Sequence, residues 1–316
     1  MGVDIFRGLL PARWQPALIQ FASWIIVGVS ASLFVSSVGL LVDSWSSTTP
    51  IGLPQWIYTF PVVIGSLFMV PNVAWVPPHL PVATYREVQK ALGLSRAVIV
   101  QPSAYGFDNS CTLDAVAQLG ESGRGIALVA PEVTDAELKR LDDGGICGVR
   151  YMMINPVLEW SSLEPMAARM AAMDWMVNLQ LDGRNFPEHE EVLKRLPCKL
   201  VIDHNGKFLE PVKPEHPAFQ SLLRVLDTGK VWIKLSAPYE TSKVGTPGYD
   251  DVSLIARTLA EKFPERCLWA SNWPHPGRNP PPSEVDLYDL LFSWVSSNEA
   301  RRKILVDNPT ALYGFR

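Results

Sequence analysis

The sequence lacks the features that mark nucleic-acid-binding proteins and disulfide-rich secreted proteins. Its 28 lysines and arginines are outnumbered by 32 aspartates and glutamates, so there is no basic excess to bind nucleic acid. The four cysteines, Cys111, Cys147, Cys198 and Cys267, form no C-x-x-C pair, and we expect buried, reduced thiols. With 316 residues, the chain has room for one large barrel or two ordinary domains.

Charged side chains are nearly absent from the first 85 residues. After Arg13 the next charged residue is Asp43, and after Asp43 the next is Arg86. The rest of the chain carries charges at an ordinary density, and four prolines cluster between residues 71 and 81, where the two regions meet. We therefore predict two units, residues 1–72 and residues 73–316.

Two apolar runs in the first unit predict membrane-spanning helices. Residues 17–42 contain no charge, and as a helix they would extend about 39 Å, enough to cross a hydrocarbon core of about 30 Å. Residues 53–70 predict a second, shorter span that Pro61 would kink. Because arginines precede the first span, the N-terminus is expected in the cytoplasm, and two crossings return the chain there. We thus expect a cytoplasmic-membrane protein that contacts the lipid bilayer through residues 17–70, with its second unit in the cytoplasm.

This first unit resembles a known membrane protein family. The stretches RWQPAL and SWSSTTPIGLPQWIYTFPVVIG are similar to the second half of the small membrane subunit (DctQ type) of TRAP dicarboxylate transporters, over about residues 8–70. The resemblance implies the large TRAP subunit as a possible partner. Such a subunit has four spans, and only the last two have counterparts in this chain.

The second unit alternates short apolar runs with amphipathic stretches, as α/β proteins with parallel sheets do. A (β/α)8 TIM-type barrel fits if one strand is added, and a doubly wound sheet is the alternative. The predicted strands are 96–102, 125–130, 148–154, 175–181, 199–204, 231–236 and 267–272. The predicted helices are 84–93, 111–120, 134–142, 162–172, 187–195, 217–227, 250–263 and 284–305.

In a barrel, chemistry takes place at the carboxyl ends of the strands, so polar residues there are candidates for a site. His204 ends a strand and could polarise a substrate carbonyl, whereas the planar fork of Arg150 could hold a carboxylate. The further candidates for substrate binding are Tyr105, Gln180, Lys207 and Tyr239.

The order of these strand ends resembles the amidohydrolase-related family, in the branch that includes 2-pyrone-4,6-dicarboxylate lactonase. The similar stretches are VQPSAYGFDN, GVRYMMI, VIDHNGKF, KLSAPYE, LWASNWPHPG and DNPTALYGF, within about residues 76–316. The resemblance implies a hydrolase that acts on a lactone, another cyclic ester or a carboxylate substrate.

Two positions depart from the family pattern. Relatives carry an aspartate as the base where this chain has Asn272, and an amide has no carboxylate to accept a proton. Asn272 could still orient a water or donate to an oxyanion, and His275 could act as the base instead. Glu240 stands where the dicarboxylate lactonase has an arginine, and its charge is expected to repel a second substrate carboxylate.

The family's first strand, which carries a D-x-H-x-H motif, has no counterpart, because no H-x-H occurs in the chain. We therefore expect a barrel without its first strand and with no bound metal or other cofactor. Residues 70–76 could fill the vacant position. Three hypotheses remain open: a membrane-anchored hydrolase impaired by this loss, an inactive gene-fusion product, and a remnant of a transporter subunit.

Overall fold

The computed structural model of the chain describes residues 80–154 and 156–315, together with residues 32, 35, 36, 38 and 42. The chain divides into two compact units, Met1–His79 and Leu80–Arg316. Apart from the five isolated positions, the predicted spans 17–42 and 53–70 and the segment 70–76 lie outside the described residues. Among the described residues, no helix combines the length and the apolar character needed to cross a bilayer.

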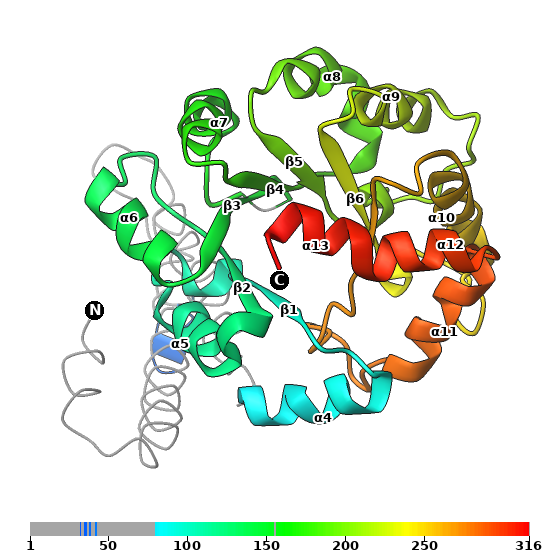
Figure 1. Cartoon of the computed structure of the whole chain (residues 1–316), viewed down its shortest axis with the longest axis horizontal. Helices are drawn as coiled ribbons and strands as arrows, with labels where there is room; N and C mark the ends of the chain where they lie inside the picture. Colours follow the sequence, from blue (N-terminus) through cyan, green and yellow to red (C-terminus); the bar gives the residue numbers. More distant parts are fainter. Residues whose placement is uncertain are drawn as a thin grey trace. The chain divides into compact units, whose positions relative to one another are not determined.

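The second unit is built on a curled parallel sheet, whose strands follow one another in chain order (Figure 1). A doubly wound sheet would reverse its strand order at a switch point, so the sequential order excludes that alternative. Every predicted strand is confirmed, to within a few residues at its ends. The strands are β1 (Ala97–Val100), β2 (Gly123–Ala127), β3 (Ile146–Met152), β4 (Met176–Gln180), β5 (Lys199–Ile202), β6 (Val231–Leu235) and β7 (Cys267–Trp269).

Helices alternate with the strands and surround the sheet on its outer side (Figure 1). The α-helices are α4 (Val82–Leu92), α5 (Ser110–Leu119), α6 (Asp135–Asp143), α7 (Leu163–Ala172), α8 (Phe186–Arg195), α9 (Pro217–Leu226), α10 (Asp250–Lys262), α11 (Glu284–Trp294), α12 (Asn298–Arg302) and α13 (Asn308–Tyr313). The short helices are η2 (Ser103–Tyr105), η3 (Gly120–Ser122), η4 (Trp160–Ser162), η5 (Gly183–Asn185), η6 (His204–Gly206), η7 (Pro238–Glu240) and η8 (Lys303–Asp307).

The single helix predicted over residues 284–305 is wrong. Helix α11 ends at Trp294, and Val295 adopts an extended conformation with φ −126° and ψ 98°. The hydroxyl of Ser297 then accepts a hydrogen bond from the Ala300 amide and starts helix α12. The apolar pattern continues through this break, which is why the sequence reads as one helix.

The two edges of the described sheet are β1 and β7, since no strand pairing joins them. Strand β1 is more exposed than the central strands: Val98, Ile99 and Val100 are half-buried, whereas all five residues of β4 are buried. Parallel strands in the middle of a sheet are covered on both faces and have neighbours on both sides. The described part of the chain therefore forms an open, barrel-like sheet.

The main apolar core lies between the sheet and the surrounding helices. Strand residues such as Leu179 and Ile233 pack there with Phe219 and Leu222 of α9, and each of these four side chains is at most 1% exposed. Burial of this kind is worth roughly 1.5–3 kcal/mol for each large apolar side chain. This core holds the helices against the strands. The loops at the strand ends therefore begin and end on rigid elements.

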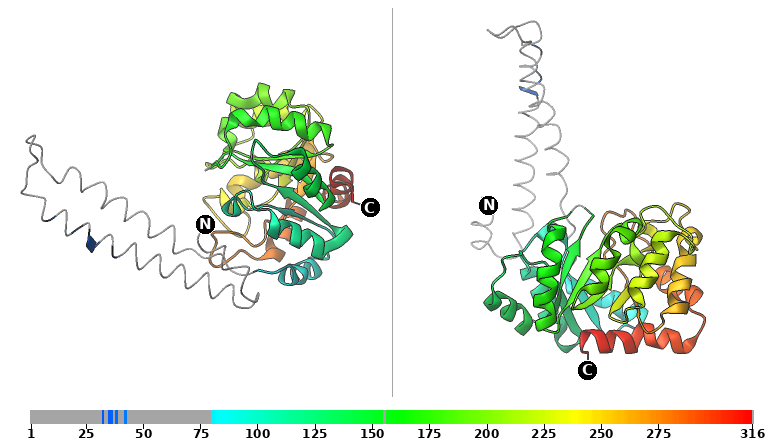
Figure 2. Two further views of the ribbon diagram at one scale, coloured as in Figure 1. Left: turned by 90° about the vertical axis from the view of Figure 1, so that its left-hand side faces the viewer. Right: turned by 90° about the horizontal axis from the view of Figure 1, so that it is seen from above.

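A second cluster closes the amino-terminal end of the sheet. Leu312, Tyr313 and Phe315, at the end of the chain, pack against Met176 and Val201 on the strands. Helix α13 lies across this end of the sheet in every view (Figures 1 and 2). The guanidinium of Arg124 on β2 anchors it by donating to the backbone oxygens of Tyr313 and Gly314. The carboxyl ends of the strands are thus the end left for a site.

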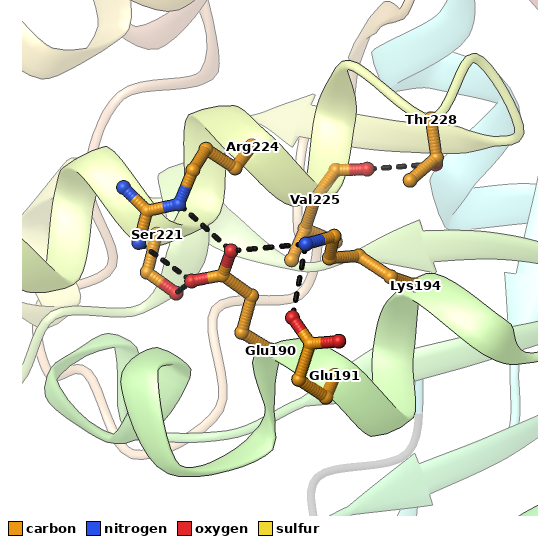
Figure 3. Close-up of polar contacts among 7 residues, drawn as sticks. All are labelled: Glu190, Glu191, Lys194, Ser221, Arg224, Val225 and Thr228. Atoms are coloured by element: carbon orange, nitrogen blue, oxygen red, sulfur yellow. Dashed lines mark hydrogen bonds and ion pairs between the residues drawn. The ribbon is translucent and has the colours of Figure 1, made fainter.

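Helices α8 and α9 are joined by a charged cluster on the outside of the unit (Figure 3). The carboxylate of Glu190 accepts hydrogen bonds from Arg224 at 2.6 and 2.7 Å and from the Ser221 hydroxyl at 2.7 Å. Lys194 bridges Glu190 and Glu191. The hydrogen bonds from Arg224 lower the pKa of Glu190 to about 2, against the effect of burial.

The expectation of four buried thiols is correct for only two of them. Cys198 and Cys267 are buried, Cys147 is half-buried and Cys111 is exposed. Burial raises the pKa of the Cys198 thiol to about 11, so this thiol stays protonated and unreactive at neutral pH. Cys111 differs because it lies in the first turn of α5 and faces solvent.

Candidate functional site

The candidate site is formed by the residues at and just beyond the carboxyl ends of β3 to β7, which we call the mouth. Side chains alternate between the two faces along a strand, so every second residue points into the sheet's concave interior. Near the amino-terminal ends this interior is apolar, with Met176, Val201 and Leu268 packed under α13. Towards the mouth, the inward-pointing side chains of the same strands are polar.

Asp203 and Lys234 form a buried ion pair at the base of the mouth. Their side chains are 4% and 9% exposed, and Lys234 Nζ lies 2.9 Å from Asp203 Oδ1. The same Nζ donates to Asn178 Oδ1 at 2.6 Å, and Gln180 Nε2 lies 3.5 Å from Asp203 Oδ2. Burial alone would raise the pKa of Asp203, but the charges of Lys234 and Arg150 outweigh it and hold the pKa well below its usual range.

His204 follows this ion pair directly and is itself buried. Its Nδ1 lies 2.9 Å from Ser236 Oγ, which fixes the ring against the end of β6. Burial first, and then the neighbouring positive charges of Lys207 and Lys234, lower the pKa of His204 to about 3, against the opposing effect of Asp203. The imidazole is therefore neutral at physiological pH, and its ring N–H can donate a hydrogen bond to a carbonyl oxygen.

Arg150 lies on β3 with part of its guanidinium free. One terminal nitrogen donates to the backbone oxygen of Gln101 at 2.8 Å. The Nε is buried and has no hydrogen-bond partner among the described residues. Burial lowers the pKa of Arg150, and the charge of Asp203 opposes this effect. A buried, unsatisfied N–H of a cation is costly, and a bound carboxylate or carbonyl oxygen would remove that cost.

A chain of hydrogen bonds runs from α11 into the mouth. Glu284 Oε1 lies 2.6 Å from His275 Nε2, and His275 Nδ1 lies 2.7 Å from the Tyr239 hydroxyl. Asn272 Nδ2 donates to the same hydroxyl at 2.8 Å and to Glu240 Oε1 at 2.8 Å. If Nε2 carries the proton that Glu284 accepts, Tyr239 donates to His275 and accepts from Asn272. Both N–H groups of Asn272 are then used, so Asn272 is left to act as an acceptor.

Lys207 and Glu240 form an ion pair across the mouth, with 10% and 17% of their side chains exposed. Lys207 comes from the loop after β5, and Glu240 ends η7 after β6. The negative charge expected to repel a second substrate carboxylate is therefore compensated by a lysine. The repulsion of a second substrate carboxylate stays a prediction.

The backbone of the mouth is strained where these residues lie. His204, Asn272 and His275 have φ values of 53°, 60° and 58°, and Lys207 and Ala237 have 49°. Residues with side chains rarely adopt this left-handed region, and such positions cluster at functional sites. The surrounding contacts must hold each of these residues in place, which is the behaviour expected of a preorganised site.

Most of the predicted site residues come together in the mouth. Tyr239, Asn272 and His275 are joined directly, Lys207 reaches them through Glu240, and Gln180 lies beside Asp203, next to His204. Tyr105 lies apart in η2, after β1, with 42% of its surface exposed. The assigned roles stay predictions, because the geometry gives positions and not activities.

Four charged residues of the mouth were missed in the sequence: Asp203, Lys234, Arg278 and Glu284. Lys234 carried a signal, because a lysine inside the apolar run VWIKL points to the same side as Ser236 at the strand end. Arg278 donates to the backbone oxygen of Tyr239 at 2.7 Å and lies over its ring. In the described part of the chain, no three His, Cys, Asp or Glu side chains come close enough together to hold a metal ion.

Comparisons with known proteins agree with this architecture. The family model described as amidohydrolase matches residues 66–315. The chain belongs to the amidohydrolase family. Residues 1–74 match a second model, the DctQ component of the tripartite ATP-independent periplasmic transporters. Both resemblances seen in the sequence are thereby confirmed.

Three proteins similar to this chain are named after a lactone or a pyrone. The 4-sulfomuconolactone hydrolase of Hydrogenophaga intermedia is 36% identical over 76% of this chain and 81% of its own length. The D-galactarolactone isomerase of Agrobacterium fabrum is 33% identical over 72% of this chain and 80% of its own. A crystal structure of a probable 2-pyrone-4,6-dicarboxylic acid hydrolase from Acinetobacter baumannii, with citric acid bound, superimposes with a TM-score of 0.69 at 27% identity, over 77% of this chain and 92% of that one.

Proposed function

We propose that the chain hydrolyses the ring ester of a lactone that carries an anionic group. The observation that supports this most strongly is the buried, unpartnered Nε of Arg150 in the described mouth, which also holds a neutral His204. Arg150 would hold the anionic group of the substrate, and His204 would hydrogen-bond to the ester carbonyl. The sulfomuconolactone hydrolase and the galactarolactone isomerase act on lactones, according to their names.

The remaining predicted residues have supporting roles in this proposal. Asn272 would accept a hydrogen bond from the attacking water, since both of its N–H groups are used within the protein. His275 is enclosed by Tyr239 and Glu284, so we assign it to positioning Tyr239 rather than to proton transfer. Gln180, Lys207 and Tyr239 would contact the substrate within the mouth, and Tyr105 would contact it from η2, after β1.

An isomerase would open the same ring but close it again on another hydroxyl. The similarity to a galactarolactone isomerase makes this the second candidate. Because ring opening needs the same polarised carbonyl, the mouth serves either reaction.

The proposal is tested by offering a panel of carboxylated and sulfonated lactones to the purified full-length chain. We expect the protein to open the ring of at least one member of the panel. Nuclear magnetic resonance spectroscopy of the product detects the opening. The Arg150→Met variant should raise KM with a smaller change in kcat, because a binding contact is lost. No turnover of any member by a folded wild-type protein would contradict the proposal.

We propose further that the open position between β1 and β7 is that of a missing first barrel strand. The support is the edge position of both strands and the half-exposed side chains of β1. Residues 70–76 are the segment of the chain that could occupy it.

We also propose that residues 1–72 anchor the enzyme to the cytoplasmic membrane by two spans, with residues 73–316 in the cytoplasm. The match to a membrane transporter component supports this arrangement. The TRAP large subunit is the partner that this match suggests. An inactive fusion of two genes is the alternative, and turnover by the full-length chain would exclude it.

A further inference from the structure

The mouth contains several groups that could accept a proton from water, and they differ in how far their side chains are exposed. Water attack on an ester requires such a group within reach of the water. Asp203 is 4% exposed and held by Lys234. His275 has both ring nitrogens in hydrogen bonds, and His204 is held neutral by burial, which opposes its protonation. Asn272 has no titratable group.

Glu240 differs from these groups in its geometry. It has 17% of its side chain exposed, and one oxygen accepts from Asn272 Nδ2 at 2.8 Å while the other faces Lys207. A carboxylate has about four lone-pair sites, and Asn272 and Lys207 occupy two of those of Glu240, so sites remain that can receive a hydrogen bond and then a proton from a water. Asn272 cannot turn its amide round, because its oxygen would then face the Glu240 carboxylate.

We propose that Glu240 is the proton acceptor of this site and that Asn272 is the positioning residue that holds it. This inference rests on the proposed hydrolysis of a lactone. The amide at position 272 and the acid at position 240 then form one unit: the acid takes the proton, and the amide both fixes the acid and accepts a hydrogen bond from the water.

Glu240 takes up one proton during the reaction and gives it back. The water oxygen forms a bond to the ester carbonyl carbon, and one water proton passes to Glu240. The bond between that carbon and the ring oxygen then breaks, and the leaving oxygen takes the proton back from Glu240. One water is consumed, the product is a hydroxy acid, and Glu240 returns to its ionised form.

The chain of hydrogen bonds behind Asn272 has a purpose in this scheme. Glu284 fixes the His275 tautomer, His275 fixes the Tyr239 hydroxyl, and that hydroxyl accepts one of the two Asn272 N–H groups. The second N–H is thereby directed at Glu240. An aspartate at position 272 would instead place two carboxylates in hydrogen-bond contact, and like charges so close disfavour joint ionisation.

The experiment compares four forms of the full-length chain with the wild type: Glu240→Gln, Asn272→Asp, the double variant, and Glu210→Gln. Glu210 is a matched control, since it also pairs with a lysine, Lys243, but is 59% exposed. Turnover is measured on the lactone that the wild type opens. Thermal unfolding at pH 8 gives a second measurement that does not depend on activity.

We expect Glu240→Gln to lower kcat by about 100-fold or more, as the loss of a general base does. The double variant, which returns a carboxylate to the neighbouring position, should have a kcat at least about tenfold higher than that of Glu240→Gln. Asn272→Asp alone should lower the Tm, and the double variant should restore most of it, because the repulsion is gone. Glu210→Gln should keep wild-type turnover and Tm.

The outcomes separate the two proposals. A folded wild type that opens no lactone overturns the proposed function, and this inference with it. If the wild type opens a lactone and Glu240→Gln keeps more than about a tenth of the wild-type kcat, this inference alone is overturned. Purely additive effects of the two substitutions on the Tm would contradict the contact between the two side chains.

Discussion

At the scale of single residues, Asp203 and His204 are adjacent in the chain and both are buried, yet Asp203 is charged and His204 is neutral. Lys234 and Arg150 keep Asp203 ionised despite burial, whereas His204 loses its proton because burial and the same positive charges act together. The mouth thus pairs a fixed negative charge with a neutral imidazole. This arrangement favours polarising a carbonyl over donating a proton from an imidazolium.

The Glu190 cluster gives a prediction about stability. Glu190→Gln should lower the free energy of unfolding by about 2 kcal/mol at pH 7, since it breaks the charge-assisted bonds to Arg224. Because the folded-state pKa is lowered to about 2, this stabilisation is present above the unfolded pKa and is lost as the pH falls from about 4.5 towards 2. Urea unfolding at several pH values measures the difference.

The matched control is Glu164→Gln. Glu164 makes the same kind of paired bonds to Arg195, but the two side chains are 49% and 57% exposed. Exposed pairs contribute little, so the control should unfold almost as the wild type does. Equal losses in both variants, or a Glu190→Gln effect that persists below about pH 2, would contradict the account of Glu190.

The position of the site residues was predictable at this scale, but their partners were not. His204, Arg150 and Asn272 could be located because each follows or ends an apolar run that the strand pattern identifies. Beyond burial, the pKa of His204 depends on Lys234 and that of Arg150 on Asp203, and these partners lie on or at the end of other strands and come near only when the sheet curls. Asn272 was predicted as a possible oxyanion donor, and only the contact with Tyr239 and Glu240 shows that both N–H groups are used.

At the scale of elements, the strands were predicted well because their burial leaves a simple pattern. Strand β4 reads as a continuous buried run, and the Asn178 within it points into the interior. The break between α11 and α12 was missed, because the apolar spacing continues past Val295 and the capping role of Ser297 is a local hydrogen bond. The π-helical turn η8 likewise left no signal.

Helix α13 closes the amino-terminal end of the sheet, which gives a second stability prediction. Leu312→Ala should lower the free energy of unfolding by about 2–4 kcal/mol, because a buried side chain is replaced by a cavity. The control Ala311→Ser changes the neighbouring, exposed position and should have a small effect. Thermal or urea unfolding measures both, and a Leu312→Ala protein as stable as the control would contradict the closing role.

At the scale of the whole molecule, the chain joins two pieces that match different family models. The boundary predicted near residue 72 lies close to the division between His79 and Leu80, and the DctQ model ends at residue 74. The amidohydrolase match begins at residue 66, so the two models overlap across the proline-rich seam. The overlap was not foreseeable from composition, which marks only where the charges resume.

The anchoring proposal predicts a difference between the full chain and residues 80–316. The full chain should sediment with membranes after cell lysis, because residues 17–42 and 53–70 are apolar. Residues 80–316 should stay in the supernatant and keep a near-ultraviolet circular dichroism spectrum typical of packed aromatic residues. A full chain found in the supernatant, or a truncated chain that sediments equally, would contradict the proposal.

The central claim is that this amidohydrolase opens a lactone by adding water to its carbonyl carbon. The most direct test is turnover by the full-length chain in water labelled with oxygen-18, followed by mass spectrometry of the product. The account predicts a hydroxy acid with one labelled oxygen, located in the new carboxylate. A product without label, or a lactone returned unchanged by a folded protein, would contradict it.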